Sequence, residues 1–181
     1  MKLTYLAAAA VVAASAPLAA HAADAGSTFS PIQAYGTIGY ANANQDGINL
    51  GAIQGRLGAR FGKYLGVEGE LAGGVKNADV AVSGRTATLK LSSEVGVYAV
   101  GFLPLSSSFD AFARVGYGRT NISATAGNGG AATGSDNSWN YGGGAQYFFT
   151  KHDGVRADYT HYHYNGGGGA NVFSVAYVRT F

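Results

Sequence analysis

The chain has 181 residues, enough for one domain, with a formal net charge of +2 and no cysteine. It combines 29 glycines, 12 tyrosines and 9 phenylalanines with only 12% charged residues. The scattered basic residues exclude a nucleic-acid-binding stripe, and the aromatic content excludes a disordered chain. The glycines leave no room for a helix of normal length after the N-terminal segment. An exported form of this chain must also be stable without disulfides.

The first segment, residues 1–22, has the pattern of a secretory signal peptide. Met1-Lys2 gives a short positive start, Leu3–Leu18 is apolar, and Ala20-His21-Ala22 fits an A-x-A cleavage site. The short, alanine-rich core argues against a transmembrane anchor. We therefore predict export through the Sec pathway with cleavage after Ala22, followed by a short periplasmic segment over residues 23–33.

From there to residue 181, apolar and polar residues alternate in eight segments. A period of two predicts β-strands with two chemically different faces. Each segment reaches the ~9–11 residues that a tilted membrane-spanning strand needs, except the first, which is marginal. The predicted strands are 34–41, 49–61, 65–74, 87–102, 109–121, 138–149, 154–164 and 170–181.

The connections between these strands alternate in length. The short ones are 62–64, 104–108 and 150–154, and the longer ones are 42–48, 74–86 and 121–137. The last, 165–169, is a glycine-rich run that predicts a tight turn. Short turns at one end and longer loops at the other are typical of an outer-membrane barrel. The predicted fold is an all-β, eight-stranded antiparallel up-and-down transmembrane β-barrel with short periplasmic turns, over residues 34–181.

One face of the predicted strands collects the charged residues. Alternation alone does not say whether this face lies inside, as in a membrane barrel, or outside, as in a soluble ligand carrier. Equal numbers of the two signs favour the inside, because an unpaired buried charge is very costly. We therefore predict a lumen filled by paired charges. These residues are Arg56, Arg60, Glu68, Glu70, Lys90, Glu94, Asp110, Arg114, Arg156 and Asp158.

Aromatic residues gather toward the ends of the strands. This distribution predicts two girdles at the membrane–water interfaces, with aliphatic side chains facing lipid between them. The closing strand places Phe173, Tyr177 and Phe181 on one face. These features favour a location in the cell outer membrane. The predicted girdle residues are Phe61, Tyr64, Phe102, Phe109, Tyr117, Trp139, Tyr141, Tyr147, Phe149 and Tyr159.

With its signal peptide, its eight spans, the segment Arg156-Ala157-Asp158-Tyr159 and the final Phe181, the chain resembles the small eight-stranded outer-membrane β-barrel proteins, the group of OmpX and the OmpA transmembrane domain. The resemblance implies periplasmic chaperones and the barrel-assembly machinery as partners, with Phe173, Tyr177 and Phe181 as the assembly signal. It implies a monomer in contact with outer-membrane lipid and lipopolysaccharide. The loops are expected to lack the long protruding strands of the adhesin-like members.

The predicted function is a structural or surface-interaction role. An eight-stranded barrel is only just wide enough for its own side chains, so a small solute channel is the first alternative. A lipid A-modifying enzyme is the second, with His161 and His163 as the local candidates. These histidines could bind a metal or act as a general base. No Asp or Glu lies nearby on the same face, however, and we expect a polar-aromatic rim without catalytic residue, cofactor or metal.

Overall fold

The computed structural model describes residues 32–45, 48–82, 85–126 and 131–181. The predicted signal peptide and residues 23–31 of the predicted periplasmic segment lie outside the described residues. Ile32 and Gln33, which end that predicted segment, belong to the first strand instead. Among the described residues, no helix is long and apolar enough to cross a membrane.

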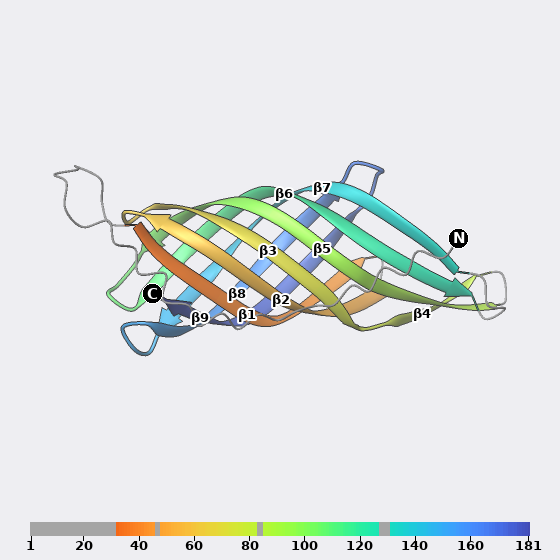
Figure 1. Cartoon of the computed structure of the whole chain (residues 1–181), viewed down its shortest axis with the longest axis horizontal. Coiled ribbons are helices and arrows are strands. Elements are labelled where there is room, and N and C mark those ends of the chain that lie inside the picture. The colour runs from red at the N-terminus through yellow and green to blue at the C-terminus, as the bar shows by residue number, and fades with distance from the viewer. Residues whose placement is uncertain (1–31, 46–47, 83–84, 127–130) are drawn as a thin grey trace, which may run out of the picture.

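The described chain folds into antiparallel strands that close on themselves. The sheet order is β3-β2-β1-β9-β8-β7-β6-β5-β4, and pairing between β3 and β5 completes the ring. Since β4 pairs at the far end of β5, the closed wall has eight strands, which confirms the predicted fold (Figure 1). The strands are β1 (Ile32–Gln45), β2 (Ile48–Phe61), β3 (Leu65–Lys76), β4 (Ala78–Val82), β5 (Arg85–Pro104), β6 (Phe109–Ala126), β7 (Ala131–Phe148), β8 (Asp153–Tyr164) and β9 (Gly169–Thr180).

The glycine run between β8 and β9 forms the tight turn that the sequence predicts. Gly167 and Gly168 have φ values of 99° and 83°, a backbone region that favours glycine. The Gly167 N–H donates to the Tyr164 carbonyl at 3.1 Å, and the Tyr164 N–H donates to the Gly168 carbonyl at 3.2 Å. A side chain at either glycine would therefore strain the turn that sets the β8–β9 register.

The two faces of the wall are chemically opposite. Leu57, Leu71, Val97 and Val175 point outward and are 75, 66, 67 and 65% exposed. The neighbouring positions on the same strands point inward and carry most of the buried polar and charged side chains. Because side chains alternate across a strand, each strand supplies both faces. An aliphatic outer band around a polar interior is the arrangement that a lipid environment requires.

The strands are longer than predicted at the loop end. β1 has 14 residues, β5 has 20, and β6 and β7 have 18 each. β4 and the outer parts of β5, β6 and β7 form a sheet that extends past the rest of the wall (Figure 1). The expectation of loops without protruding strands is therefore wrong. The antiparallel ladder continues because it satisfies the backbone groups of residues that have no apolar face to bury.

Candidate functional site

A network of charged side chains crosses the lumen. Arg56 Nε lies 2.6 Å from Glu70 Oε2, and Arg56 Nη1 lies 2.7 Å from Asp158 Oδ2. All three side chains are at most 1% exposed. Ser174 also donates its hydroxyl to Asp158 at 2.8 Å. Because these residues come from β2, β3, β8 and β9, the network links strands across the interior and not only along one ladder.

A second ion pair joins Arg156 on β8 to Glu68 on β3. Arg156 Nη1 lies 2.5 Å from Glu68 Oε1, and Nη2 lies 3.2 Å from Glu68 Oε2. The Tyr35 hydroxyl donates to Glu68 Oε1 at 2.8 Å. The Arg156 guanidinium also lies 3.8 Å from the centre of the Phe112 ring. The buried Arg156 guanidinium therefore forms a bidentate ion pair with a carboxylate and a cation–π contact with an aromatic ring.

Arg114 on β6 connects the network to a layer of hydroxyl groups. Arg114 Nη2 donates to Glu70 Oε2 at 2.7 Å, and its guanidinium lies 3.5 Å from the centre of the Tyr98 ring. Tyr98 and Tyr162 donate their hydroxyls to Glu70 Oε1 at 3.0 and 3.1 Å. Asn140 in turn donates to the Tyr98 hydroxyl at 2.8 Å. Glu70 therefore accepts hydrogen bonds from both the arginine and the tyrosine layers.

A separate pair lies near the short-turn mouth of the lumen. Arg60 Nη1 lies 2.7 Å from Asp110 Oδ2, which also accepts a hydrogen bond from Gln146 at 2.9 Å. The Arg60 guanidinium donates a hydrogen bond to the Lys63 carbonyl, and its central carbon lies 4.3 Å from the centre of the Phe102 ring. These residues line a mixed polar and apolar cavity of about 360 Å³. The side chains of Arg60 and Asp110 remain 14% and 10% exposed, so this pair is wetter than the central network.

Lys90 does not join the other predicted lumen charges. It is exposed, because the β5–β6 register shifts between Leu91 and Ser93. An extra residue at such a bulge reverses which side chains face inward, so Leu91 is buried and Lys90 is not. Glu94, beyond the bulge, is only 7% exposed, and its Oε1 has no hydrogen-bond partner among the described residues. The predicted balance of lumen charges is therefore wrong by one positive charge.

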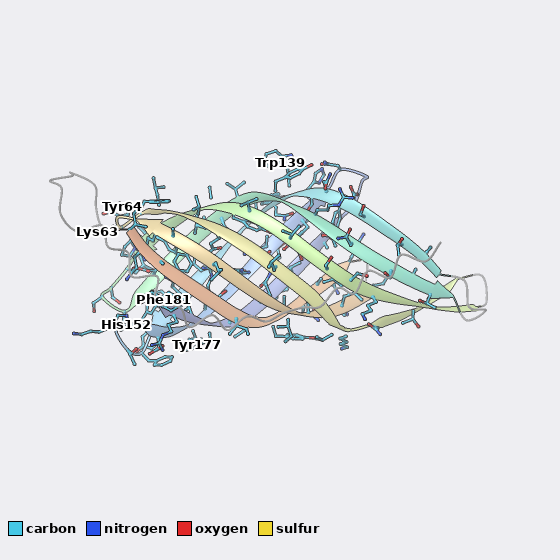
Figure 2. All side chains as sticks on the ribbon, viewed as in Figure 1. Lys63, Tyr64, Trp139, His152, Tyr177 and Phe181 are labelled. Carbon is cyan, nitrogen blue, oxygen red and sulfur yellow. The ribbon has the colours of Figure 1, made fainter. Side chains whose placement is uncertain are left out.

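One predicted girdle residue, Phe102, lies inside the barrel. It is 4% exposed and packs edge-on against Tyr35, with ring centres 6.0 Å apart. Its assignment is wrong because Phe102 shares the inward parity of Val100. Figure 2 shows Tyr64 near the short-turn end and Trp139 toward the other end. The other predicted girdle residues point outward and are exposed: Phe61, Tyr64, Phe109, Tyr117, Trp139, Tyr141, Tyr147, Phe149 and Tyr159.

The closing strand presents its aromatic residues outward, with Phe173 toward the loop end and Tyr177 and Phe181 toward the short-turn end. Phe173, Tyr177 and Phe181 are 58, 40 and 70% exposed. Figure 2 shows Tyr177 and Phe181 near the same end of the barrel as Tyr64. The Phe181 N–H donates to the Ala34 carbonyl at 2.9 Å, so the final residue still pairs with β1. The Tyr177 hydroxyl donates to the Asp153 carboxylate. Their role as an assembly signal stays a prediction.

His161 and His163 lie on the outer face of β8 and do not converge with acidic groups. The His161 ring nitrogen Nδ1 is 2.9 Å from Asn171 Oδ1, and its ring lies 5.3 Å from that of Tyr141. His163 is exposed and stands opposite Trp139 in the β7–β8 register. Within the described part of the chain, no group of three or more His, Cys, Asp or Glu residues could hold a metal ion. His161 and His163 therefore lie beside Tyr141 and Trp139 in an aromatic rim on the outer face.

A closed barrel with an aliphatic outer band, aromatic residues at its ends and a charged interior defines a transmembrane β-barrel protein. Residues 6–181 match the model of a family described as the outer membrane protein beta-barrel domain. The chain belongs to this family, and its location in the outer membrane follows. No curated protein matches the sequence.

Solved structures with the same fold are small outer-membrane barrels. One is Ail, the attachment invasion locus protein of Yersinia pestis, in complex with the heparin analogue sucrose octasulfate. It matches with a TM-score of 0.62 and 18% sequence identity, and the match covers 84% of this chain and 100% of Ail. The N-terminal barrel of Pseudomonas aeruginosa OprF matches with a TM-score of 0.59 and 13% identity, covering 84% and 99%. Neisserial surface protein A matches with a TM-score of 0.53 and 14% identity, covering 85% and 98%.

Proposed function

We propose that this protein is a surface-interaction protein whose projecting sheet binds an extended segment of an extracellular partner. The observation that carries the proposal is the extent of β7. Its outer part pairs with β6 from Ala131 onward, whereas its pairing with β8 begins only at Ser138. An outer strand edge presents backbone N–H and C=O groups that can pair with an added strand. The exposed side chains along this edge, such as Thr133 and Ser135, are small and leave the backbone accessible.

The experiment shortens β6 and β7 and keeps their pairing from Asn121–Ser135 to Phe109–Tyr147. Residues 122–134 are replaced by Asn-Gly, which joins Asn121 to Ser135, an opposed pair in the β6–β7 register. Cells that display either form are compared for binding to immobilised extracellular-matrix proteins and unstructured peptides. We expect the shortened form to lose binding while its gel band still shifts on boiling. Equal binding by the two forms would reject the projecting sheet as the interaction surface.

The side chains inside the barrel favour a filled lumen over an open solute channel. The central arginines and carboxylates are at most 1% exposed and bridge β2, β3, β6 and β8. Since an eight-stranded barrel is just wide enough for side chains to fill, this network obstructs passage. We expect pure protein in planar bilayers to give no steady unitary conductance. Uniform, long-lived channels would favour the channel instead.

Three exposed cations suggest how the barrel contacts lipopolysaccharide. Lys76 is the last residue of β3, Lys90 and Arg119 lie within the loop-side halves of β5 and β6, and all three are exposed. Arg119 stands opposite Val95, which belongs to the outward aliphatic band. Cations just beyond a lipid-facing band suit phosphate groups of the outer leaflet. Replacing all three with glutamine should lower the lipopolysaccharide retained on the detergent-purified barrel, and unchanged retention would reject this contact.

A further inference from the structure

The buried charges of the lumen leave one carboxylate in excess. Among the described residues, the inward cations are all arginines, and they are outnumbered by the inward carboxylates. The arginines are Arg56, Arg60, Arg114 and Arg156, and the carboxylates are Glu68, Glu70, Glu94, Asp110 and Asp158. Every one of these carboxylates except Glu94 lies within ion-pair distance of an arginine. A buried, uncompensated charge is strongly unfavourable, so Glu94 must bind either a proton or a cation.

The atoms around Glu94 identify what could do so. Glu94 Oε1, Thr120 Oγ1, Ser138 Oγ and Asn140 Oδ1 are all buried and have no hydrogen-bond partner among the described residues. The four side chains are 7, 4, 0 and 0% exposed. Orphaned buried polar atoms are rare in folded proteins, and each calls for a water molecule, a ligand or an ion. All four are oxygen atoms, the ligand type that hard cations prefer.

The strand register places these four residues on neighbouring positions of β5, β6 and β7. Glu94 stands opposite Thr120, and Ser138 stands opposite Gly118. Gly118 carries no side chain, so the Asn140 amide lies over it, with Nδ2 2.9 Å from the position that a Cβ would take. Opposed Cβ atoms in an antiparallel pair are ~4.5–5.5 Å apart and diagonal neighbours ~7–8 Å. Side chains from β5, β6 and β7 therefore surround Gly118 on the inner face.

We propose that Glu94, Thr120, Ser138 and Asn140 form a binding site for a monovalent alkali cation inside the barrel. One positive charge brings the excess negative charge to zero, whereas a divalent ion would leave an excess of the opposite sign. Calcium also takes 6–8 oxygen ligands, commonly with several carboxylates, and this site has one. A water molecule could satisfy the oxygens but would leave the charge of Glu94 uncompensated.

The test measures thermal unfolding of the full barrel, folded in detergent micelles, as loss of the heat-modifiable gel band. Melting is compared in sodium chloride, potassium chloride and tetramethylammonium chloride at equal ionic strength and pH. Tetramethylammonium cannot be coordinated by oxygen atoms as an alkali cation is, because four methyl groups surround its charge. We expect the wild-type barrel to melt about 2–4 °C higher in the sodium or potassium salt. Glu94→Gln, which keeps the shape and removes the charge, should melt at the same temperature in all three, and Thr120→Val should show a smaller shift.

Asp153→Asn serves as the control, because it removes a half-buried carboxylate at the start of β8, at the opposite end of the barrel, and should respond to the salts as the wild type does. Two results would overturn the proposal. If Glu94→Gln shows the same salt-dependent shift as the wild type, the effect is a general ionic one. If the wild type melts equally in all salts and becomes more stable at lower pH while Glu94→Gln does not, Glu94 binds a proton and not a metal ion.

Discussion

Replacing Arg114 with alanine tests whether the lumen network stabilises the barrel. The Arg114 side chain is 0% exposed, donates to Glu70 Oε2 at 2.7 Å and lies 3.5 Å from the centre of the Tyr98 ring. The substitution removes all of these contacts and leaves a cavity beside a buried carboxylate. The wall itself loses nothing, because the strand pairing of residue 114 is made by its backbone.

The size of the effect follows from what remains around Glu70. Removing one partner of a buried ion pair costs about 3–5 kcal/mol, because the other charge stays buried. Glu70 keeps Arg56 at 2.6 Å and its two tyrosine donors, which limits the loss from the ion pair to the lower end of that range. The lost contact with the Tyr98 ring adds up to about 2 kcal/mol. We therefore expect the free energy of unfolding to fall by about 3–5 kcal/mol.

The assay is urea unfolding of barrels reconstituted in lipid vesicles, followed by the fluorescence of Trp139, the single tryptophan of the chain. Trp139 is 56% exposed on the outer face and reports when the wall leaves the lipid. Arg179→Ala is the control: its ion pair with Asp153, at 2.8 Å, is exposed and should contribute nothing measurable. If Arg114→Ala lowers stability by less than about 1 kcal/mol with an unchanged denaturant slope, the network does not stabilise the barrel, and the argument from buried pairing is refuted.

Three further substitutions test the outer face, the packing of the interior and assembly. Leu57→Arg should lower stability by about 2–4 kcal/mol in vesicles if residue 57 lies near the middle of the lipid, and an unchanged urea midpoint would contradict the lipid-facing assignment. Gly116→Ala should cost about 1–3 kcal/mol in the same assay, because its Cβ would clash with the Val97 carbonyl oxygen and lie 2.6 Å from the Tyr98 ring; equal stability would show that the strand and the ring adjust without cost. Phe181→Ala should reduce the amount of heat-modifiable barrel in cells while leaving refolding of the purified protein in micelles nearly unchanged, and normal cellular amounts would reject Phe181 as an assembly signal.

Several features of the barrel could be predicted from the sequence because they depend on local periodicity. Side chains alternate along any strand, so Leu57 and Arg56 must face opposite ways wherever the strand lies. Phe102 could also have been placed correctly, since it shares its parity with Tyr98. The extended strands near residues 122–126 and 131–137 could not be predicted in this way, because polar residues exposed on both faces carry no alternation.

The sequence by itself determined the strand-rich fold, the short turns and which residues share a face, because these follow from a period of two and from turn chemistry. Tertiary structure alone decided which charges meet. Arg56 contacts Asp158 across 102 residues of sequence, and only closure of the wall brings them to 2.7 Å. It also decided the bulge at Leu91–Ser93, which turns Lys90 outward and so removes a cation from the face that carries Glu94. A shift of one residue in pairing reverses the faces beyond it, and pairing is a property of two strands together.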